Sequence, residues 1–363
     1  MTKQKISDKE RSVITFSRMV FCLLMVWSHV NYFFSSYRFP SKNIDSLAPL
    51  VTSDNLQSFL ARFITYPIAP GFFFMAGLLL GINTLLGKKY SNIFFFKKSF
   101  YCLFFGVLLN LFGFGGKFLE FEVLYCFAIL FLLVPFLRKF NSIILLSISL
   151  LGFLISQFLS SNPTSEVLNF IVRVFVLGGE ASSHVRIVFP IVGWLGVFLV
   201  GYVLGQKGYY KKFLDMKRLV MTGLTFVLCF LLTKTIDIQN AMTSGNIWDY
   251  LQVLVANKIP PKFDFVFLGF CSISFVFLGG IFLSKKESWQ NKISSILHID
   301  ALDWYVIHLF LLLIARKYFH ISKTESFSLI LGYCVLISFL TYFLVRLNMK
   351  FKRKFLKRER SEK

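Results

Sequence analysis

Residues 12–34 read SVITFSRMVFCLLMVWSHVNYFF, an apolar run that contains one arginine, Arg18, and one histidine, His29. A helix rises about 1.5 Å per residue, so a run of about 20 apolar residues matches the hydrocarbon thickness of a bilayer. A buried helix of a soluble protein could be equally apolar. The rest of the chain decides between the two.

The composition of the whole chain favours a membrane protein. Of its 363 residues, 56% are hydrophobic, only 16% are charged and 47 are phenylalanines. A soluble domain of this length has no core large enough to bury so many apolar side chains. The sequence therefore predicts an all-α, polytopic integral membrane protein.

Apolar blocks recur along the chain and predict about ten transmembrane helices. They cover residues 12–34, 66–87, 99–116, 120–137, 142–161, 187–206, 218–236, 264–284, 300–318 and 326–347. The loops between them are too short for a second domain. We therefore expect one transmembrane domain over residues 1–363, with a basic cytoplasmic tail from about residue 348.

The distribution of lysine and arginine predicts the orientation. With the N-terminus in the cytoplasm, the inner segments hold 26 of these residues and the outer segments hold 12. Positive charge concentrates on the cytoplasmic side, so both termini are predicted to be cytoplasmic. The net charge of +22 is then a topology signal, and the basic tail is expected to contact membrane lipids rather than nucleic acid. The bias towards Phe, Ile, Lys and Asn is typical of proteins from AT-rich genomes and favours a bacterial source. A bacterial protein of this class would lie in the inner membrane.

Arg18 and His29 are the basic residues of the first block. Eleven residues make about three helical turns, so both side chains share one helix face, roughly 16 Å apart along the axis. Ionisable side chains inside a membrane usually face a cavity or a partner. In the alternative, Arg18 snorkels to cytoplasmic lipid phosphates and His29 is a polar residue near the outer interface. Spacing alone leaves both open.

Motifs for a metal or a bound cofactor are absent from the sequence. No metal-ligand spacing and no phosphate loop occur, and the six cysteines lie inside apolar blocks, where they are expected to be small buried residues. We therefore expect neither a metal site nor a permanently bound cofactor.

Three helices carry motifs that resemble the membrane acyltransferase-3 family. The first is the Arg18-x10-His29 pair, the second is PGFFFMAGLLLG at residues 70–81, and the third is ALDWYVIHLF at residues 301–310. The chain departs from that pattern at Asp303, where serine is common.

A fourth helix is similar to a sister family. The segment FPIVGWLGVFLVGYVLG at residues 189–205 resembles the Pro-x-x-x-Trp-x-Gly helix of heparan-glucosaminide N-acetyltransferase-like membrane proteins. Both families share the pattern of the first helix.

The resemblance implies acyl transfer across a membrane by a membrane-bound O-acyltransferase. The donor would be cytoplasmic acetyl-CoA. The acceptor would be a sugar hydroxyl, or less often an amine, of a cell-surface or lipid-linked glycan on the outer side. The motifs do not specify the identity of the glycan or the length of the acyl group.

Within this interpretation, His29 is the general base. An imidazole titrates near neutral pH, so it can take a proton from a hydroxyl and return one to the leaving thiolate. Direct transfer is favoured, and a covalent acyl-imidazole is the alternative. Arg18 is assigned to the phosphates or the pantetheine channel of the donor, where a planar cation fits. Lys97 and Lys98, expected at the start of the third span, would either hold the nucleotide phosphates or only anchor the helix.

Four further residues are candidates around this base. His308 would complete the site or orient the acceptor, or else be a structural histidine, and Tyr305 lies one turn before it on the same face. Trp304 would pack a sugar or the thioester, or simply a neighbouring helix. Glu122, expected near the outer start of the fourth span, would bind sugar hydroxyls or solvate a short turn.

A transporter or flippase for a lipid-linked glycan precursor is the alternative function. Such proteins usually show internal repeats and more polar residues at mid-membrane, and neither is clear in this sequence. Binding of coenzyme A distinguishes the two classes. The pairs Gly77/Gly81 and Gly201/Gly205 have the spacing that lets membrane helices approach closely in either class.

Overall fold

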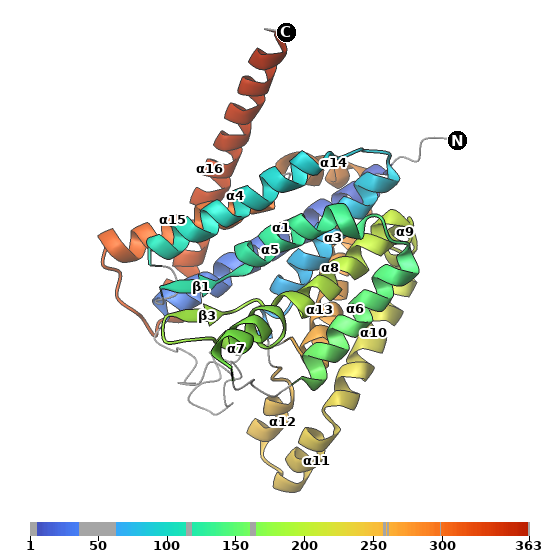
Figure 1. Ribbon diagram of the computed structural model, residues 1–363, viewed down its shortest axis with the longest axis vertical. Helices are drawn as coiled ribbons and strands as arrows, with labels where there is room; N and C mark the ends of the chain where they lie inside the picture. Colours follow the sequence, from blue (N-terminus) through green and yellow to red (C-terminus); the bar gives the residue numbers. More distant parts are fainter. Residues whose placement is uncertain are drawn as a thin grey trace.

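The computed structural model describes residues 6–35, 63–113, 118–159, 165–256, 259, 261–297 and 299–361. Most of these residues are helical, and the long helices pack side by side (Figure 1). Ten of the helices correspond to the ten predicted blocks. They are α1 (Asp8–Phe34), α3 (Ile68–Leu85), α4 (Asn92–Leu111), α5 (Val123–Leu137), α6 (Ser142–Phe158), α8 (Ile191–Gln206), α10 (Met216–Thr233), α13 (Phe263–Leu283), α15 (Ala301–Tyr318) and α16 (Phe327–Ser361).

The helices of membrane-spanning length support a polytopic membrane protein. Within the described residues, six helices are long and apolar enough to cross a bilayer, namely α1, α3, α4, α10, α13 and α16. Three more, α5, α6 and α8, are apolar but shorter. The number of crossings and the cytoplasmic placement of both termini stay predictions.

The described part of the chain is mostly helical, as predicted, but it also contains a small sheet that was not predicted. Strands β1 (Leu119–Phe121), β2 (Gly179–Glu180) and β3 (Val185–Ile187) form a small sheet in the order β1-β3-β2. The pairing of β1 with β3 is parallel and that of β2 with β3 is antiparallel. These residues precede α5 and α8 and were expected to be part of those spans or of a loop. We call the end of the bundle that holds this sheet the sheet end. The opposite end, where Lys88, Lys89 and Arg138 lie, is called the basic end.

Several short helices connect the long ones. They are α7 (Glu166–Val172), the π-helix η2 (Arg173–Leu177), α9 (Tyr210–Phe213), α11 (Thr235–Ser244), α12 (Ile247–Val253) and α14 (Glu287–Ile296). The helix α16 continues past the rest of the bundle towards the C-terminus, so the basic tail begins as a helical extension (Figure 1).

The start of α4 corrects the predicted third span. Ser91 caps this helix by accepting a hydrogen bond from the backbone N–H of Phe94, so the helix begins at Asn92 and not near residue 99. Lys97 and Lys98 therefore lie in its second turn and not at its start. The boundary is set by the side-chain cap of Ser91, which a hydropathy pattern does not detect.

Glycines allow the closest helix packing in the molecule. A Cβ on Gly77 of α3 would lie 2.0 Å from the carbonyl oxygen of Phe198, and one on Gly201 of α8 would lie 2.1 Å from that of Phe74. Gly81 and Gly205 meet the facing backbones in the same way. The predicted close approach of these helices is therefore confirmed.

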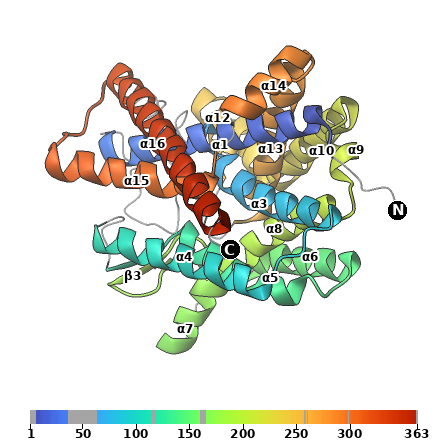
Figure 2. The same cartoon turned by 90° about the horizontal axis from the view of Figure 1, so that it is seen from above.

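The helix α1 lies at the centre of the contacts that build the site. It packs against α3, α13, α14, α15 and α16. Seen from above, α4, α5 and α6 form one row and α1, α13 and α10 another, with α3 and α8 between them (Figure 2). A side chain on the inner face of α1 can therefore meet side chains of α15, although the two helices lie at opposite ends of the chain.

Candidate active site

Two histidines from these two helices are in direct contact. Nδ1 of His29 on α1 lies 2.8 Å from Nε2 of His308 on α15, and the ring centroids are 5.1 Å apart. His308 is fully buried and His29 is half-buried. The structure thus brings together His29 and His308, the residue that was predicted to complete the site or orient the acceptor, or else to be structural.

The hydrogen bonds of the pair determine where the protons lie. Nδ1 of His308 is 2.8 Å from the backbone carbonyl oxygen of Trp304. A carbonyl oxygen only accepts, so this Nδ1 carries the proton and Nε2 of the neutral ring is an acceptor. Nδ1 of His29 must then donate to His308. The lone pair of the neutral His29 ring is consequently on its Nε2, the atom that can take a proton.

Tyr305 and Glu122 lie beside the histidine pair. The Tyr305 ring meets the rings of His29 and His308 edge-on, with centroids 6.0 and 5.6 Å away. Its hydroxyl donates a hydrogen bond of 3.2 Å to Oε2 of Glu122. Glu122 is buried and is the N-cap residue of α5, where the helix dipole favours its negative charge. A carboxylate is therefore held beside the histidine pair by the Tyr305 hydroxyl and by the start of α5.

Trp304 fixes α15 against α1. Its side chain is fully buried, and its indole N–H donates a hydrogen bond of 3.2 Å to the carbonyl oxygen of Cys22. This position corresponds to the helix-packing alternative for Trp304. Because the Trp304 carbonyl oxygen also accepts from His308, the same residue positions the second histidine from both its side chain and its backbone.

Arg18 lies on α1 towards the basic end. Its Nε atom is buried and has no hydrogen-bond partner in the described part of the chain. The Asp300 carboxylate interacts with it electrostatically. An arginine donor that is out of water and unpaired is energetically unfavourable, so this side chain is suited to meet a ligand that brings an acceptor.

Asp300 is a residue that sequence reasoning missed. It caps α15 by accepting from the backbone N–H groups of Leu302 and Asp303, at 3.0 and 3.4 Å. The usable signal was an aspartate immediately before an apolar helix, a typical N-cap pattern. Its carboxylate is the acidic neighbour of Arg18, and it therefore balances part of the buried charge at the basic end.

Asp303, which stands where serine is common in the acyltransferase-3 pattern, makes an ion pair and two hydrogen bonds to neighbouring helices. It is buried and accepts from Lys352 at 2.7 and 2.9 Å, from Asn348 at 3.0 Å and from Tyr101 at 3.1 Å. This network joins α4, α15 and α16 at the basic end.

The predicted phosphate-binding lysines lie at the edge of this network. Lys97 is exposed, and Lys98 is half-buried with its ammonium group 6.0 Å from the centroid of the Tyr101 ring. The Tyr101 hydroxyl in turn contacts Asp303. Lys98 is thus the one of the two that lies next to the Tyr101 side chain of this network.

The comparisons with known proteins agree with one of the two resemblances. The family model of the heparan-alpha-glucosaminide N-acetyltransferase catalytic domain matches residues 16–242. This range is more than half of the chain and includes Arg18, His29 and Glu122. A comparison with curated proteins finds no match. The chain belongs to the heparan-alpha-glucosaminide N-acetyltransferase catalytic family, a family of membrane acetyltransferases whose donor is acetyl-CoA.

Proposed function

We propose that this chain transfers the acetyl group of cytoplasmic acetyl-CoA to a sugar hydroxyl of a cell-surface or lipid-linked glycan on the outer side of a bacterial inner membrane. The observation that carries this proposal is the contact of 2.8 Å between His29 and His308, which leaves His29 with a basic Nε2. The motif resemblance to acyltransferase-3 proteins supports a hydroxyl as the acceptor.

The reaction requires one proton acceptor and later one proton donor. Nε2 of His29 takes the proton of the acceptor hydroxyl while its oxygen attacks the thioester carbonyl carbon. The C–S bond then breaks, and the imidazolium returns the proton to the leaving thiolate. The products are an acetyl ester and free coenzyme A, so atoms and charge balance without another reactant.

His308 acts through His29. It accepts the Nδ1–H of His29 and is itself fixed by the carbonyl oxygen of Trp304. This chain of two hydrogen bonds holds the tautomer and the ring orientation that the base needs, the role a carboxylate has in a catalytic triad. His308 is therefore a positioning residue.

The two ends of the site serve the two substrates. Arg18, with its buried unpaired Nε, is assigned to the donor on the basic side, together with Lys97 and Lys98. Glu122 and Tyr305 are assigned to the acceptor on the sheet side, where a carboxylate accepts hydrogen bonds from sugar hydroxyls. A thioester placed between the two groups would lie beside His29.

The first experiment separates catalysis from donor binding. Purified His29→Ala protein should still be stabilised thermally by coenzyme A, because Arg18 and the lysines are intact, yet it should lose about 10²–10⁴-fold in acetyl transfer. Folded His29→Ala protein that acetylates at the normal rate would overturn the assignment of the base. A native protein that shows no thermal response to coenzyme A would overturn the acetyltransferase mechanism and favour a transporter.

The second experiment identifies the acceptor. Surface glycans from cells with the native gene and with a His29→Ala gene are compared by mass spectrometry, before and after mild alkali. Alkali removes an acetyl ester and leaves an acetyl amide. Loss of alkali-labile acetyl in the variant supports a hydroxyl acceptor, whereas loss of alkali-stable acetyl shows that the acceptor is an amine.

A further inference from the structure

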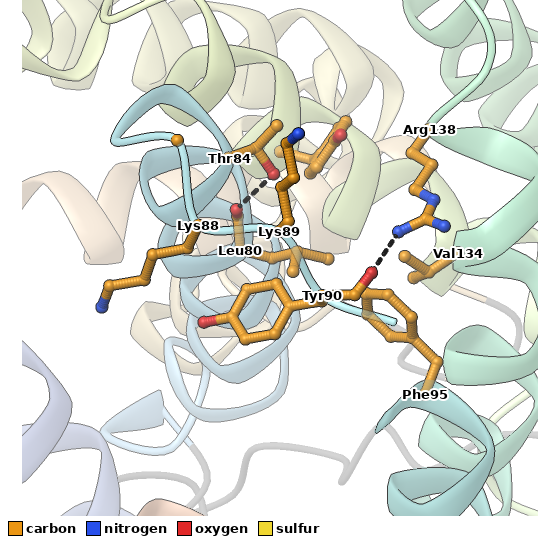
Figure 3. Close-up of a pocket in the computed structure, with 10 residues that line it drawn as sticks. Leu80, Thr84, Lys88, Lys89, Tyr90, Phe95, Val134 and Arg138 are labelled. Carbon is orange, nitrogen blue, oxygen red and sulfur yellow. Dashed lines mark hydrogen bonds between the residues drawn. The ribbon is translucent and has the colours of Figure 1, made fainter. Parts of the chain in front are cut away.

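A cavity of about 450 Å³ lies at the basic end of the bundle, between the ends of α3, α5 and α8 and the start of α4. Its lining includes three cationic side chains, Lys88, Lys89 and Arg138 (Figure 3). Gly87, with a φ of +75°, ends α3 and turns the chain so that both lysines follow at the rim. Its lining residues do not include His29 or His308, so this cavity is distinct from the histidine pair of the candidate active site.

The guanidinium of Arg138 is held in place. One terminal nitrogen donates to the backbone oxygen of Tyr90 at 2.7 Å, and the other donates to the side-chain oxygen of Asn92 at 2.6 Å. The group also lies 5.6 Å from the centroid of the Phe95 ring. Figure 3 shows the hydrogen bond to Tyr90 and the Lys89 side chain extending towards Thr84. A guanidinium has five N–H donors, so a fixed cation with further donors borders the cavity.

The charge of the cavity is unbalanced. Its described lining contains three cations and no aspartate or glutamate. Like charges around one space repel one another, and an anion placed among them relieves this repulsion. Phosphate suits the site because arginine binds it through paired N–H groups and lysine as a point charge.

Part of the cavity lining is apolar. Leu80, Val134 and Phe95 contribute this part, and the hydroxyl-bearing Thr84 and Tyr202 lie in the same lining. A free inorganic ion would leave the apolar surface uncovered. A phosphate ester would place its charge among the cations and its organic part, an acyl chain or a base, against the apolar side chains.

We propose that this cavity binds the phosphate group of a phosphate ester at the cytoplasmic face. The ester comes either from an anionic membrane phospholipid or from a nucleotide. The site rests on its own residues and does not depend on the role of His29. If the source is the nucleotide of the donor, the site extends the proposed function; if it is a phospholipid, it anchors the protein in its membrane.

The test compares two lysine pairs that both follow an apolar helix at the basic end. The double variant Lys88→Gln/Lys89→Gln removes two cations from the cavity. The double variant Lys285→Gln/Lys286→Gln removes an equally exposed pair after α13 that does not line it. Both variants lose the same charge, and their thermal midpoints check that they fold.

Two probes distinguish the sources of phosphate. Calorimetric titration with adenosine 3′,5′-bisphosphate measures nucleotide binding to the purified protein. Native mass spectrometry measures retention of phosphatidylglycerol against phosphatidylcholine. We expect the Lys88→Gln/Lys89→Gln variant to lose at least tenfold in either nucleotide affinity or phosphatidylglycerol retention. The Lys285→Gln/Lys286→Gln variant should lose less than twofold in both measurements.

Each outcome decides the proposal. A selective loss of the nucleotide identifies a nucleotide site, and a selective loss of phosphatidylglycerol identifies a lipid site. If neither probe is affected, or if both variants lose binding equally, the cavity has no role as a phosphate site and the lysines act only through general charge. These results do not involve acetyl transfer, so they are distinguishable from failure of the proposed function.

Discussion

His29 and His308 are 279 residues apart in the chain, and their ring nitrogens lie 2.8 Å apart. This contact crosses from the first long helix to the ninth. It turns two scattered histidines into one hydrogen-bonded unit in which the second is anchored to a backbone carbonyl. The predictions below concern this unit, the arginine on the donor side, the acceptor side and the packing that holds them.

Replacing His308 should impair catalysis without impairing donor binding. His308→Leu removes the acceptor for the Nδ1–H of His29, so the base loses its fixed tautomer and orientation. We expect kcat to fall about 10²-fold or more, with the KM for acetyl-CoA nearly unchanged. Steady-state kinetics in detergent or nanodiscs measures both values.

His308→Gln is the matched control for this change. Its side-chain amide offers an oxygen acceptor near the position of Nε2, so part of the lost kcat should return. A purely structural histidine would instead make the two variants differ in thermal stability and not in kcat. Equal kcat for native protein and His308→Leu would contradict the positioning role.

Changing Arg18 should weaken the donor complex. Arg18→Leu removes the buried guanidinium, so the affinity for coenzyme A should fall about 10- to 150-fold, as expected for the loss of a charge-assisted hydrogen bond of about 1.5–3 kcal/mol. The coenzyme A affinity of Arg18→Lys protein should lie between those of native and Arg18→Leu protein, because an ammonium group keeps the charge but lacks the planar, bidentate donors of a guanidinium.

The same helix provides the control for Arg18. Arg11→Leu removes an exposed arginine whose nearest acid is Asp8, at 3.7 Å, and should leave coenzyme A affinity unchanged. Isothermal titration measures the coenzyme A affinity of the native protein and of these three variants. An unchanged affinity in Arg18→Leu would end the donor-channel assignment.

Removing the Tyr305 hydroxyl should affect the acceptor side. Tyr305→Phe leaves the buried Glu122 carboxylate with one hydrogen-bond donor fewer, which should lower the free energy of unfolding by about 1–3 kcal/mol. If Glu122 also binds the sugar, the KM for the acceptor should change while that for acetyl-CoA does not. Tyr342→Phe, which removes a bond to the carbonyl of Ile296 at an exposed site, should change the unfolding free energy by less than about 1 kcal/mol.

Adding one methyl group at the α3–α8 contact should destabilise the bundle. In Gly201→Ala the new Cβ would lie 2.1 Å from the carbonyl oxygen of Phe74, so the helices must separate. We expect a loss of about 1–3 kcal/mol or more in thermal or denaturant unfolding. Gly332→Ala on α16 meets nothing within 4 Å and should be neutral or slightly stabilising, since alanine favours a helix. Equal stability of the two variants would contradict the close contact.

The amino-acid sequence by itself determined the helical membrane class, the approximate positions of the long helices and the close glycine contact between α3 and α8. These features depend on local hydropathy and on small-residue spacing, which are read along the chain. The start of α4 was misplaced because the Ser91 side chain caps the helix before the apolar block begins, and hydropathy does not detect such a cap. The short sheet was missed because strands of two or three residues leave no hydropathy pattern.

Only the tertiary structure decided how the polar residues of different helices meet. Spacing placed Arg18 and His29 on one face of the first helix, but it contained no information on which residue of α15 faces them. The rotation and depth at which α15 packs on α1, fixed in part by the Trp304 bond to Cys22, put Nε2 of His308 against His29. Packing between distant helices selects such partners because it depends on the shapes of both surfaces at once, and no single segment of the chain carries that information.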